Sequence, residues 1–361
     1  MTRKPAFRFK LAISVIAAIV FLGWIGRAQT QAAAANPLQG LREYLSGAVD
    51  IQERHHKRLR TIPNVVGTAV GVSEEGKPII KVYTKSPGVM AIPTSLDGFR
   101  VEVEETGEFH ALTGQFGGQQ YGSDKTRARR VNPATLFTRP VPIGVSTGNE
   151  GECSAGTIGA RVKDAGGNGN VFALSNNHVY ALENAAVSNS AVLQPGLYDT
   201  NCTFNPANVI GTLSSFVPIV FSTSANNTVD AAIAASDVLL LGKSTPSNGY
   251  GTPRSATVSA FVGQRVKKYG RTTSQTSGQV LGINAIVMVG YGSGTAQFVD
   301  QIIVKSSKAF ILPGDSGALL VTAQSNNPVG LLFAGNGNGK IAIANRIDAV
   351  LNAFSVTIDG N

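Results

Sequence analysis

Residues 311–321 read ILPGDSGALLV, which is a tight turn around Ser316 followed at once by an apolar strand. Gly314 has no Cβ and can adopt the backbone conformation that such a turn needs. The turn can then expose the Ser316 hydroxyl and direct the backbone N–H groups of Gly314 and Ser316 toward one point, as in an oxyanion hole. An ordinary glycine-rich hairpin turn explains the same residues equally well.

The chain around this turn consists of short apolar runs separated by Gly, Asn, Ser and Pro. Short strands with turn residues roughly every 8–12 positions are typical of an all-β sandwich or barrel. We therefore expect residues 139–361 to form a β domain that closes with a short helix, Ile347–Phe354. The expected strands are Gly156–Val162, Val171–Leu174, Asp230–Ala234, Gln279–Val289, Gln301–Val304, Ala318–Val321, Val329–Phe333 and Ile341–Ala344.

Residues 36–115 show a mixed pattern. Leucines at helical spacing with charged residues between them predict an amphipathic helix up to about Arg60. The apolar runs Val65–Val72 and Ile79–Tyr83, joined by a polar turn, predict a β-hairpin, and the alternating run Phe99–Glu104 predicts a third strand. We therefore expect a small α+β leader domain before the β domain.

Residues 116–138 lose this periodicity and are expected to be a linker. Its basic cluster ends in Arg129-Arg130, which favours proteolytic nicking at this place. A solvated basic loop that is never cut is equally consistent with the sequence.

The first 35 residues are typical of a secretory signal peptide. Four basic residues precede an apolar run from Leu11 to Gly26, and small residues up to Ala35 then supply a cleavage site. The run is shorter than the roughly 20 residues that cross a bilayer comfortably. We expect export with cleavage after Ala34 or Ala35 and a secreted or periplasmic protein. An uncleaved membrane anchor is the alternative, and only that case would involve the membrane.

The charge distribution argues against nucleic-acid binding. The net charge is +9, but five basic residues and no acidic residue lie in the first 35 positions, so +4 remains for the rest of the chain. A dense basic face is therefore not indicated. Neither a Cys/His cluster with zinc spacing nor a calcium loop is visible, and we expect no metal and no cofactor.

The two cysteines, Cys153 and Cys202, fit an oxidising compartment, where an even pair forms a disulfide. Such a bond would contribute about 4 kcal/mol in the chain-entropy model. Two buried free thiols are the alternative.

A serine hydroxyl needs a base, and the base needs a group that orients it. His178 is the sole histidine of the β domain and follows an apolar strand, although a lone histidine is more often structural. Asp230 heads an apolar run, where an ionised carboxylate needs a partner. The Nδ1–H of His178 would supply that partner, whereas a strand-terminal cap is the alternative role of Asp230.

The order of His178, Asp230 and Ser316, together with the segments around them, resembles the chymotrypsin-like (trypsin-fold) serine peptidases over about residues 140–354. The quoted segments are Ser175-Asn176-Asn177-His178-Val179, Asp230-Ala231-Ala232-Ile233-Ala234 and Gly314-Asp315-Ser316-Gly317. The leader segments Ile62-Pro63-Asn64-Val65-Val66-Gly67 and Leu96-Asp97-Gly98-Phe99 resemble bacterial trypsin-like peptidases related to the plant narrow-leaf peptidases.

This resemblance implies two six-stranded antiparallel β-barrels. The first would carry His178 and Asp230, and the second Ser316. Ser316 would attack a peptide carbonyl while His178 takes its proton, and Asp230 would stay ionised and hold the imidazole tautomer.

The resemblance also implies a substrate site. An edge strand that includes Phe333, Ala334 and Gly335 would pair with an extended peptide. Phe310 stands where trypsin has the acid of its specificity pocket, so an apolar preference is expected rather than cleavage after Lys or Arg. In animal members of the family, a new N-terminus pairs with the acid beside the nucleophile, which is Asp315 in this sequence. The activation sequence of those members is absent here.

These observations together predict a secreted serine endopeptidase that acts on protein or peptide substrates. A catalytically silent protease fold that serves as a binding module outside the cytoplasm is the alternative. In a third interpretation the leader is a pro-domain that inhibits the peptidase or assists its folding. The sequence does not indicate an oligomeric state.

Overall fold

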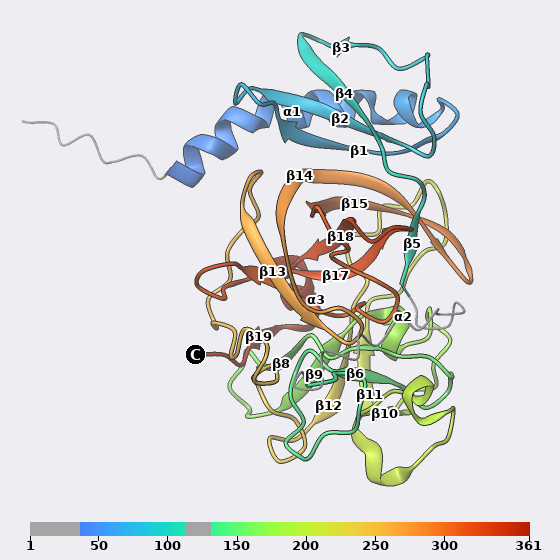
Figure 1. Ribbon diagram of the computed structural model, residues 1–361, viewed down its shortest axis with the longest axis vertical. Helices are drawn as coiled ribbons and strands as arrows, with labels where there is room; N and C mark the ends of the chain where they lie inside the picture. Colours follow the sequence, from blue (N-terminus) through green and yellow to red (C-terminus); the bar gives the residue numbers. More distant parts are fainter. Residues whose placement is uncertain (1–36, 113–130) are drawn as a thin grey trace, which may run out of the picture. The chain divides into compact units, whose positions relative to one another are not determined.

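The computed structural model describes residues 37–112 and 131–361, with side chains from Leu45 onward (Figure 1). The expected signal peptide and the Arg129-Arg130 pair lie outside the described residues. Pro37–Asn361 form one compact unit. Within the part that the structure describes, no helix is long and apolar enough to cross a membrane.

The first half of the β segment forms one antiparallel sheet in the order β19-β8-β9-β12-β11-β10-β6-β7. At one edge of the sheet β7 pairs with β6, and toward the other edge β8 pairs with β9. Only Ile158 and Gly159 separate β7 from β8, so the two edges are joined through the chain. The sheet thereby closes into a barrel. Its strands are β6 (Ser146–Asn149), β7 (Gly156–Thr157), β8 (Ala160–Asp164), β9 (Val171–Ser175), β10 (Ala191–Leu193), β11 (Val209–Phe216), β12 (Ala232–Ser236) and β19 (Val356–Ile358).

The second half forms a six-stranded antiparallel barrel in the order β13-β16-β17-β18-β15-β14, and pairing of β13 with β14 closes it. A terminal helix, α3 (Ile347–Phe354), then leads to β19 in the first barrel. The strands are β13 (Arg265–Gly270), β14 (Ser274–Tyr291), β15 (Gly294–Lys305), β16 (Leu319–Thr322), β17 (Pro328–Asn336) and β18 (Ile341–Arg346).

The leader consists of one helix and a small sheet. The helix α1 (Pro37–Arg60) packs on β1 (Val65–Val72) and β2 (Pro78–Thr84), which form the expected hairpin. The strand β4 (Phe99–Glu105) pairs in parallel with β2 and antiparallel with the short β3 (Ser95–Leu96). Because β1 also pairs with β14, the leader sheet is continuous with the sheet of the second barrel.

One further strand of the leader, β5 (Phe109–Ala111), joins the second barrel directly. It pairs antiparallel with β17 and parallel with the end of β14. The registers place Ala111 opposite Ala334 and His110 opposite Gly335. This strand was not expected from the sequence, because three residues are too few to show an alternating pattern.

The predicted fold class is confirmed: the chain is mainly β, with a double antiparallel barrel preceded by a small α+β segment. The helix Ile347–Phe354 is confirmed, and each expected strand overlaps an observed one. The expected strand Gly156–Val162 is interrupted where its chain passes from β7 to β8. The strand expected at Asp230 begins instead at Ala232.

The two cysteines form a disulfide, as expected. The bond links the loop after β6, which contains Cys153, to Cys202, close after the short 3-10 helix Leu197–Thr200. It therefore links two loops of the first barrel. These loops lie near the Ser316 turn, because Asp199 in the 3-10 helix pairs with Arg271 beside that turn.

Candidate active site

The pairing of two strands in the first barrel brings His178 and Asp230 together. His178 lies in the short helix α2 (Asn177–Tyr180) directly after β9, and Asp230 precedes β12, which pairs with β9. His178 Nδ1 is 2.6 Å from Asp230 Oδ2, and both side chains are fully buried. A carboxylate only accepts hydrogen bonds, so this contact suits the tautomer of His178 in which Nδ1 carries the proton and Nε2 does not. The contact expected from the sequence is present.

Several neighbours hold the Asp230 carboxylate and its backbone in place. Tyr291, at the end of β14, donates its hydroxyl to Oδ2 at 2.9 Å, and the backbone N–H of His178 approaches Oδ1 at 3.3 Å. The Asp230 N–H donates to Asn345 Oδ1, and the Asp230 carbonyl accepts from Asn176 Nδ2. The carboxylate is thus fixed by groups from both barrels.

Tyr291 is a site residue that the sequence analysis missed. Its ring lies edge-on against the imidazole of His178, with ring centroids 6.0 Å apart. Burial raises the pKa of Tyr291 well above its ordinary value, and the negative charge of Asp230 adds to this shift. The phenol therefore stays protonated and donates to the carboxylate.

The turn around Ser316 has the backbone conformation that its glycines allow. Gly314 and Gly317 have φ angles of +97° and +91°. A Cβ at position 317 would lie 2.2 Å from Ser175 Oγ, so a side chain would not fit there. Thr157 supports the turn from the first barrel, because its N–H donates to the Ser316 carbonyl at 2.7 Å and its hydroxyl to the Gly314 carbonyl at 2.8 Å.

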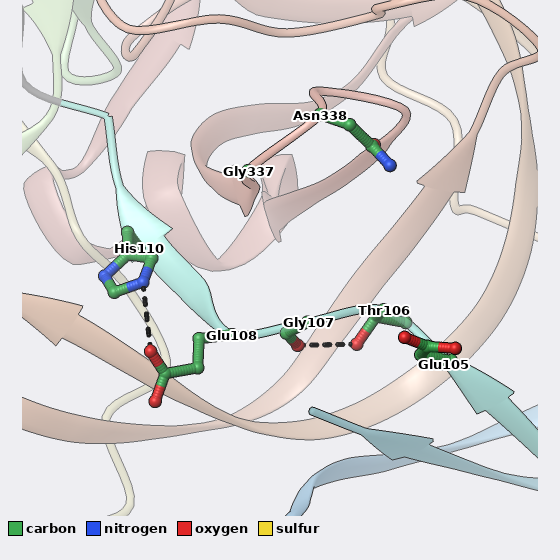
Figure 2. A pocket seen from close by; sticks show the side chains of 7 residues that line it. All are labelled: Glu105, Thr106, Gly107, Glu108, His110, Gly337 and Asn338. Atoms are coloured by element: carbon green, nitrogen blue, oxygen red, sulfur yellow. Dashed lines mark hydrogen bonds and ion pairs between the residues drawn. The ribbon is translucent and has the colours of Figure 1, made fainter. Parts of the chain in front are cut away.

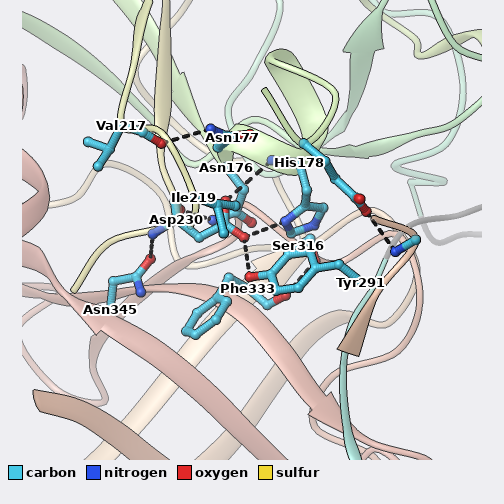
Figure 3. Close-up of polar contacts among 12 residues, drawn as sticks. Asn176, Asn177, His178, Val217, Ile219, Asp230, Tyr291, Ser316, Phe333 and Asn345 are labelled. Carbon is cyan, nitrogen blue, oxygen red and sulfur yellow. Dashed lines mark hydrogen bonds and ion pairs between the residues drawn. The ribbon is translucent and has the colours of Figure 1, made fainter. Parts of the chain in front are cut away.

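Figure 3 shows that the side chains of His178, Asp230, Tyr291 and Ser316 gather in one place. The Ser316 hydroxyl donates to the carbonyl of Phe333 at 3.2 Å. The Nε2 of His178 is buried and has no hydrogen-bond partner among the described residues. For His178 to accept the Ser316 proton, the hydroxyl would have to turn from the Phe333 carbonyl toward Nε2. Hydrogen bonds between catalytic groups are often long or poorly aligned before a substrate binds.

A buried ion pair fixes the acid next to the nucleophile. Lys268 Nζ lies 3.0 Å from Asp315 Oδ2, and neither side chain is exposed. Burial lowers the pKa of Lys268, and the adjacent Asp315 carboxylate opposes this shift. Asp315 also accepts hydrogen bonds from the N–H groups of Leu312 and Thr272. The cation that pairs with Asp315 is thus a lysine side chain of β13.

The N–H of Gly314, one of the two donors expected to form an oxyanion hole, is already occupied. It donates to the carbonyl of Leu112 at 3.0 Å. Leu112 directly follows β5, whose pairing with β17 lays the chain along the strand expected to bind substrate. Among the described residues, the second expected donor, the N–H of Ser316, makes no backbone hydrogen bond.

The residues expected to bind substrate are buried under this segment. Phe333, Ala334 and Gly335 belong to β17, and the first two have no exposed surface. Phe310 is also fully buried and shares an apolar cluster with Leu112. The residues predicted to bind substrate are therefore already in contact with the protein's own segment Phe109–Leu112.

Replacing Tyr291 by phenylalanine is expected to lower kcat/KM about tenfold, because Asp230 loses one of the donors that orient it. Steady-state hydrolysis of one peptide by both proteins measures the effect. Tyr269→Phe is the matched control, since its hydroxyl donates to the neutral Asn248 at 2.7 Å. Equal losses in the two variants would contradict a positioning role for Tyr291.

Within the described ranges, no group of three or more His, Cys, Asp or Glu side chains could hold a metal ion. The arrangement at Ser316 relies on a hydroxyl, an imidazole and a carboxylate. This set is suited to nucleophilic acyl transfer.

Comparison with known proteins gives one family model and several solved structures. The model of the Nal1 C-terminal domain matches residues 198–358, which include Asp230 and Ser316. A glutamic acid specific serine protease is 22% identical, with a TM-score of 0.43, and the match covers 60% of this chain and all of that protein. No curated protein matches.

Two further structures are similar at the same level. Thermobifida fusca protease A is 17% identical, with a TM-score of 0.44, over 61% of this chain and 100% of its own. Cellulomonas bogoriensis chymotrypsin is 21% identical, with a TM-score of 0.41, over 61% of this chain and 99% of its own.

Proposed function

We propose that this chain is a serine endopeptidase with Ser316 as nucleophile, His178 as general base and Asp230 as the group that orients the base. The observation that carries the proposal is the buried His178–Asp230 pair at 2.6 Å, with an unpartnered Nε2 beside Ser316 (Figure 3). Ordinary packing does not call for a buried basic nitrogen without a partner, because such an atom costs free energy.

The reaction would proceed by acyl transfer. Ser316 Oγ attacks the carbonyl carbon of a peptide bond while Nε2 accepts its proton, and the N–H groups of Gly314 and Ser316 stabilise the oxyanion. Nε2 then gives the proton to the leaving amine. A water molecule, deprotonated in the same way, releases the acyl group from Ser316.

The Lys268–Asp315 pair supports the view that this site needs no new N-terminus to form. The ammonium comes from β13, so the turn that carries Gly314 and Ser316 is held within the intact chain. Asp315 accepts hydrogen bonds from the N–H of Thr272, in the connection between β13 and β14, and from the N–H of Leu312, just before the turn.

We further infer that the protein works outside the cytoplasm, with residues 36–115 as a leader segment and residues 139–361 as the peptidase segment. The disulfide and the basic-then-apolar N-terminal sequence support this location. The match to the Nal1 C-terminal domain supports the closer relation to the plant narrow-leaf peptidases.

A catalytically silent binding module is the second candidate. The observation that favours it is the Ser316 hydroxyl, which donates to Phe333 rather than to His178. The two candidates differ in whether peptide bonds are cut.

Hydrolysis of an unfolded protein, followed by the appearance of new amino groups, tests the proposed function. We expect cleavage by the wild type and none by Ser316→Ala. Because Leu112 occupies the Gly314 N–H, the assay includes Leu112→Asp, with Leu239→Asp at a 74% exposed leucine as its control. If the wild type and Leu112→Asp are folded but hydrolyse no faster than Ser316→Ala, the binding module is the explanation.

A further inference from the structure

The segment Phe109–Leu112 lies against the Ser316 turn in the arrangement of a bound substrate. We propose that it is the first substrate of this protein, which cuts its own chain on the carboxyl side of Leu112 and so prefers leucine-sized apolar residues before the bond it cleaves. This inference rests on the proposed function and names the substrate class of the same site.

The backbone register is the first support. β5 adds to β17 as an antiparallel strand, with Ala111 opposite Ala334 and His110 opposite Gly335. β-Strand addition holds a peptide through its main chain and leaves alternate side chains to be read by pockets. The strand to which the resemblance assigns an extended substrate therefore already carries an extended peptide.

The reacting carbonyl is the second support. The Leu112 carbonyl accepts the Gly314 N–H at 3.0 Å, and Gly314 is two residues before Ser316. A donor at this place polarises the carbonyl and stabilises the oxyanion that forms on attack. The contact selects the peptide bond that follows Leu112 among all bonds of the segment.

The side chain of Leu112 is the third support. It is 7% exposed and belongs to the apolar cluster that contains Phe310 and Ile311. A Cβ built on Gly335 would come within 3.3 Å of Leu112 Cδ1, so the absence of a side chain at 335 leaves room for the leucine. The neighbours of Leu112 in this cluster are apolar, so a Lys, Arg or Glu side chain would lose its hydration among them.

A cavity of about 460 Å³ lies at the other end of the segment (Figure 2). It is lined by Glu105, Thr106, Gly107, Glu108, His110, Gly337 and Asn338. Leu112 and Ser316 are not among its lining residues. This cavity therefore lies beside the amino end of β5, away from the peptide bond that follows Leu112.

The self-cleavage step is ordinary acyl transfer. Ser316 Oγ bonds to the Leu112 carbonyl carbon, the bond from that carbon to the next nitrogen breaks, and the leaving amine takes the proton held by His178. Water then releases Leu112 as a carboxylate and restores the Ser316 hydroxyl. Because β1 stays paired with β14, the cut leader is expected to remain bound to the barrel.

The test starts from the full chain and reads its ends by intact mass and N-terminal sequencing. We expect the wild type to yield a new N-terminus at Thr113-Gly114-Gln115 and Ser316→Ala to stay uncut there. Leu112→Asp should slow this cleavage at least about 100-fold, whereas Leu239→Asp should leave it unchanged.

A second measurement does not depend on the folding of a Leu112 variant. Wild type is offered fluorogenic peptides that end in Phe-His-Ala-Leu, Phe-His-Ala-Lys or Phe-His-Ala-Glu, and kcat/KM should favour the leucine peptide roughly 100-fold. A protein that hydrolyses peptides but is cut only after Arg129 or Arg130, or that prefers Lys or Glu, overturns this inference and leaves the proposed function standing. Absence of any hydrolysis overturns the proposed function itself.

Discussion

The Asp230→Asn variant is expected to lose about 10⁴-fold in kcat and to keep its fold. Oδ2 of the carboxylate accepts from both His178 Nδ1 and Tyr291, while Oδ1 lies near the backbone N–H of His178. An amide has one donor end, so either orientation sets an NH₂ group against another donor. With the NH₂ group at the Oδ2 position, the imidazole loses the acceptor that keeps the proton on Nδ1; with the amide oxygen there, the backbone N–H of His178 loses its acceptor and the negative charge beside the imidazole is gone in either case.

Peptide hydrolysis measures the loss, and thermal unfolding checks the fold. Asp237→Asn is the matched control, because that acid accepts a hydrogen bond from the Leu239 N–H in an exposed turn. It should stay within about twofold of wild type. A small effect of Asp230→Asn, or an unchanged rate in His178→Ala, would reject the assigned roles.

The Lys268→Met variant is expected to lose about 3–5 kcal/mol of unfolding free energy, because it leaves the buried Asp315 carboxylate without its counter-ion. Activity should fall with stability, since Asp315 links Leu312, just before the Ser316 turn, to Thr272 in the connection between β13 and β14. Denaturant unfolding monitored by circular dichroism gives the free energy.

Two further variants separate the ion pair from the loss of a lysine as such. Lys267→Met changes the neighbouring, partly exposed lysine and should cost less than about 1 kcal/mol. Adding Asp315→Asn to Lys268→Met removes the unpaired charge and should restore part of the lost stability. Equal losses from both lysine variants would show that the buried pair does not contribute as described.

The sequence was informative where local patterns and residue chemistry point the same way. The apolar runs predicted most strands of both barrels, because alternation and turn residues are local signals. The contact between His178 and Asp230 followed from the need of a buried carboxylate for a partner. Their catalytic roles, like that of Ser316, stay predictions until activity is measured.

Two residues of the site were missed although a signal was present. Val266 and Lys268 alternate on one face of β13, and both are fully buried. The same alternation carries Val287, Val289 and Tyr291 inward at the end of β14. Lys268 and Tyr291 are thus polar side chains at inward-facing strand positions, and this placement was the available signal. It was weak for Lys268, because lysines near the end of a strand are more often solvated.

The position of Phe109–Leu112 could not be derived from the sequence. Its pairing with β17 joins residues more than 220 positions apart, and nothing in three residues sets that register. The strand is held by two neighbours, β14 and β17, which both belong to the second barrel. Only the assembled barrel shows that the expected substrate strand is already paired.

A fluorophosphonate probe, which reacts covalently with an activated serine, shows whether Ser316 is a nucleophile. The wild type and Leu112→Asp are treated with the probe, digested and mapped by mass spectrometry, with Ser316→Ala as the control. We expect one adduct on Ser316, faster labelling of Leu112→Asp than of wild type, and no adduct in Ser316→Ala. Folded protein that stays unlabelled at Ser316 in both wild type and Leu112→Asp would contradict this expectation.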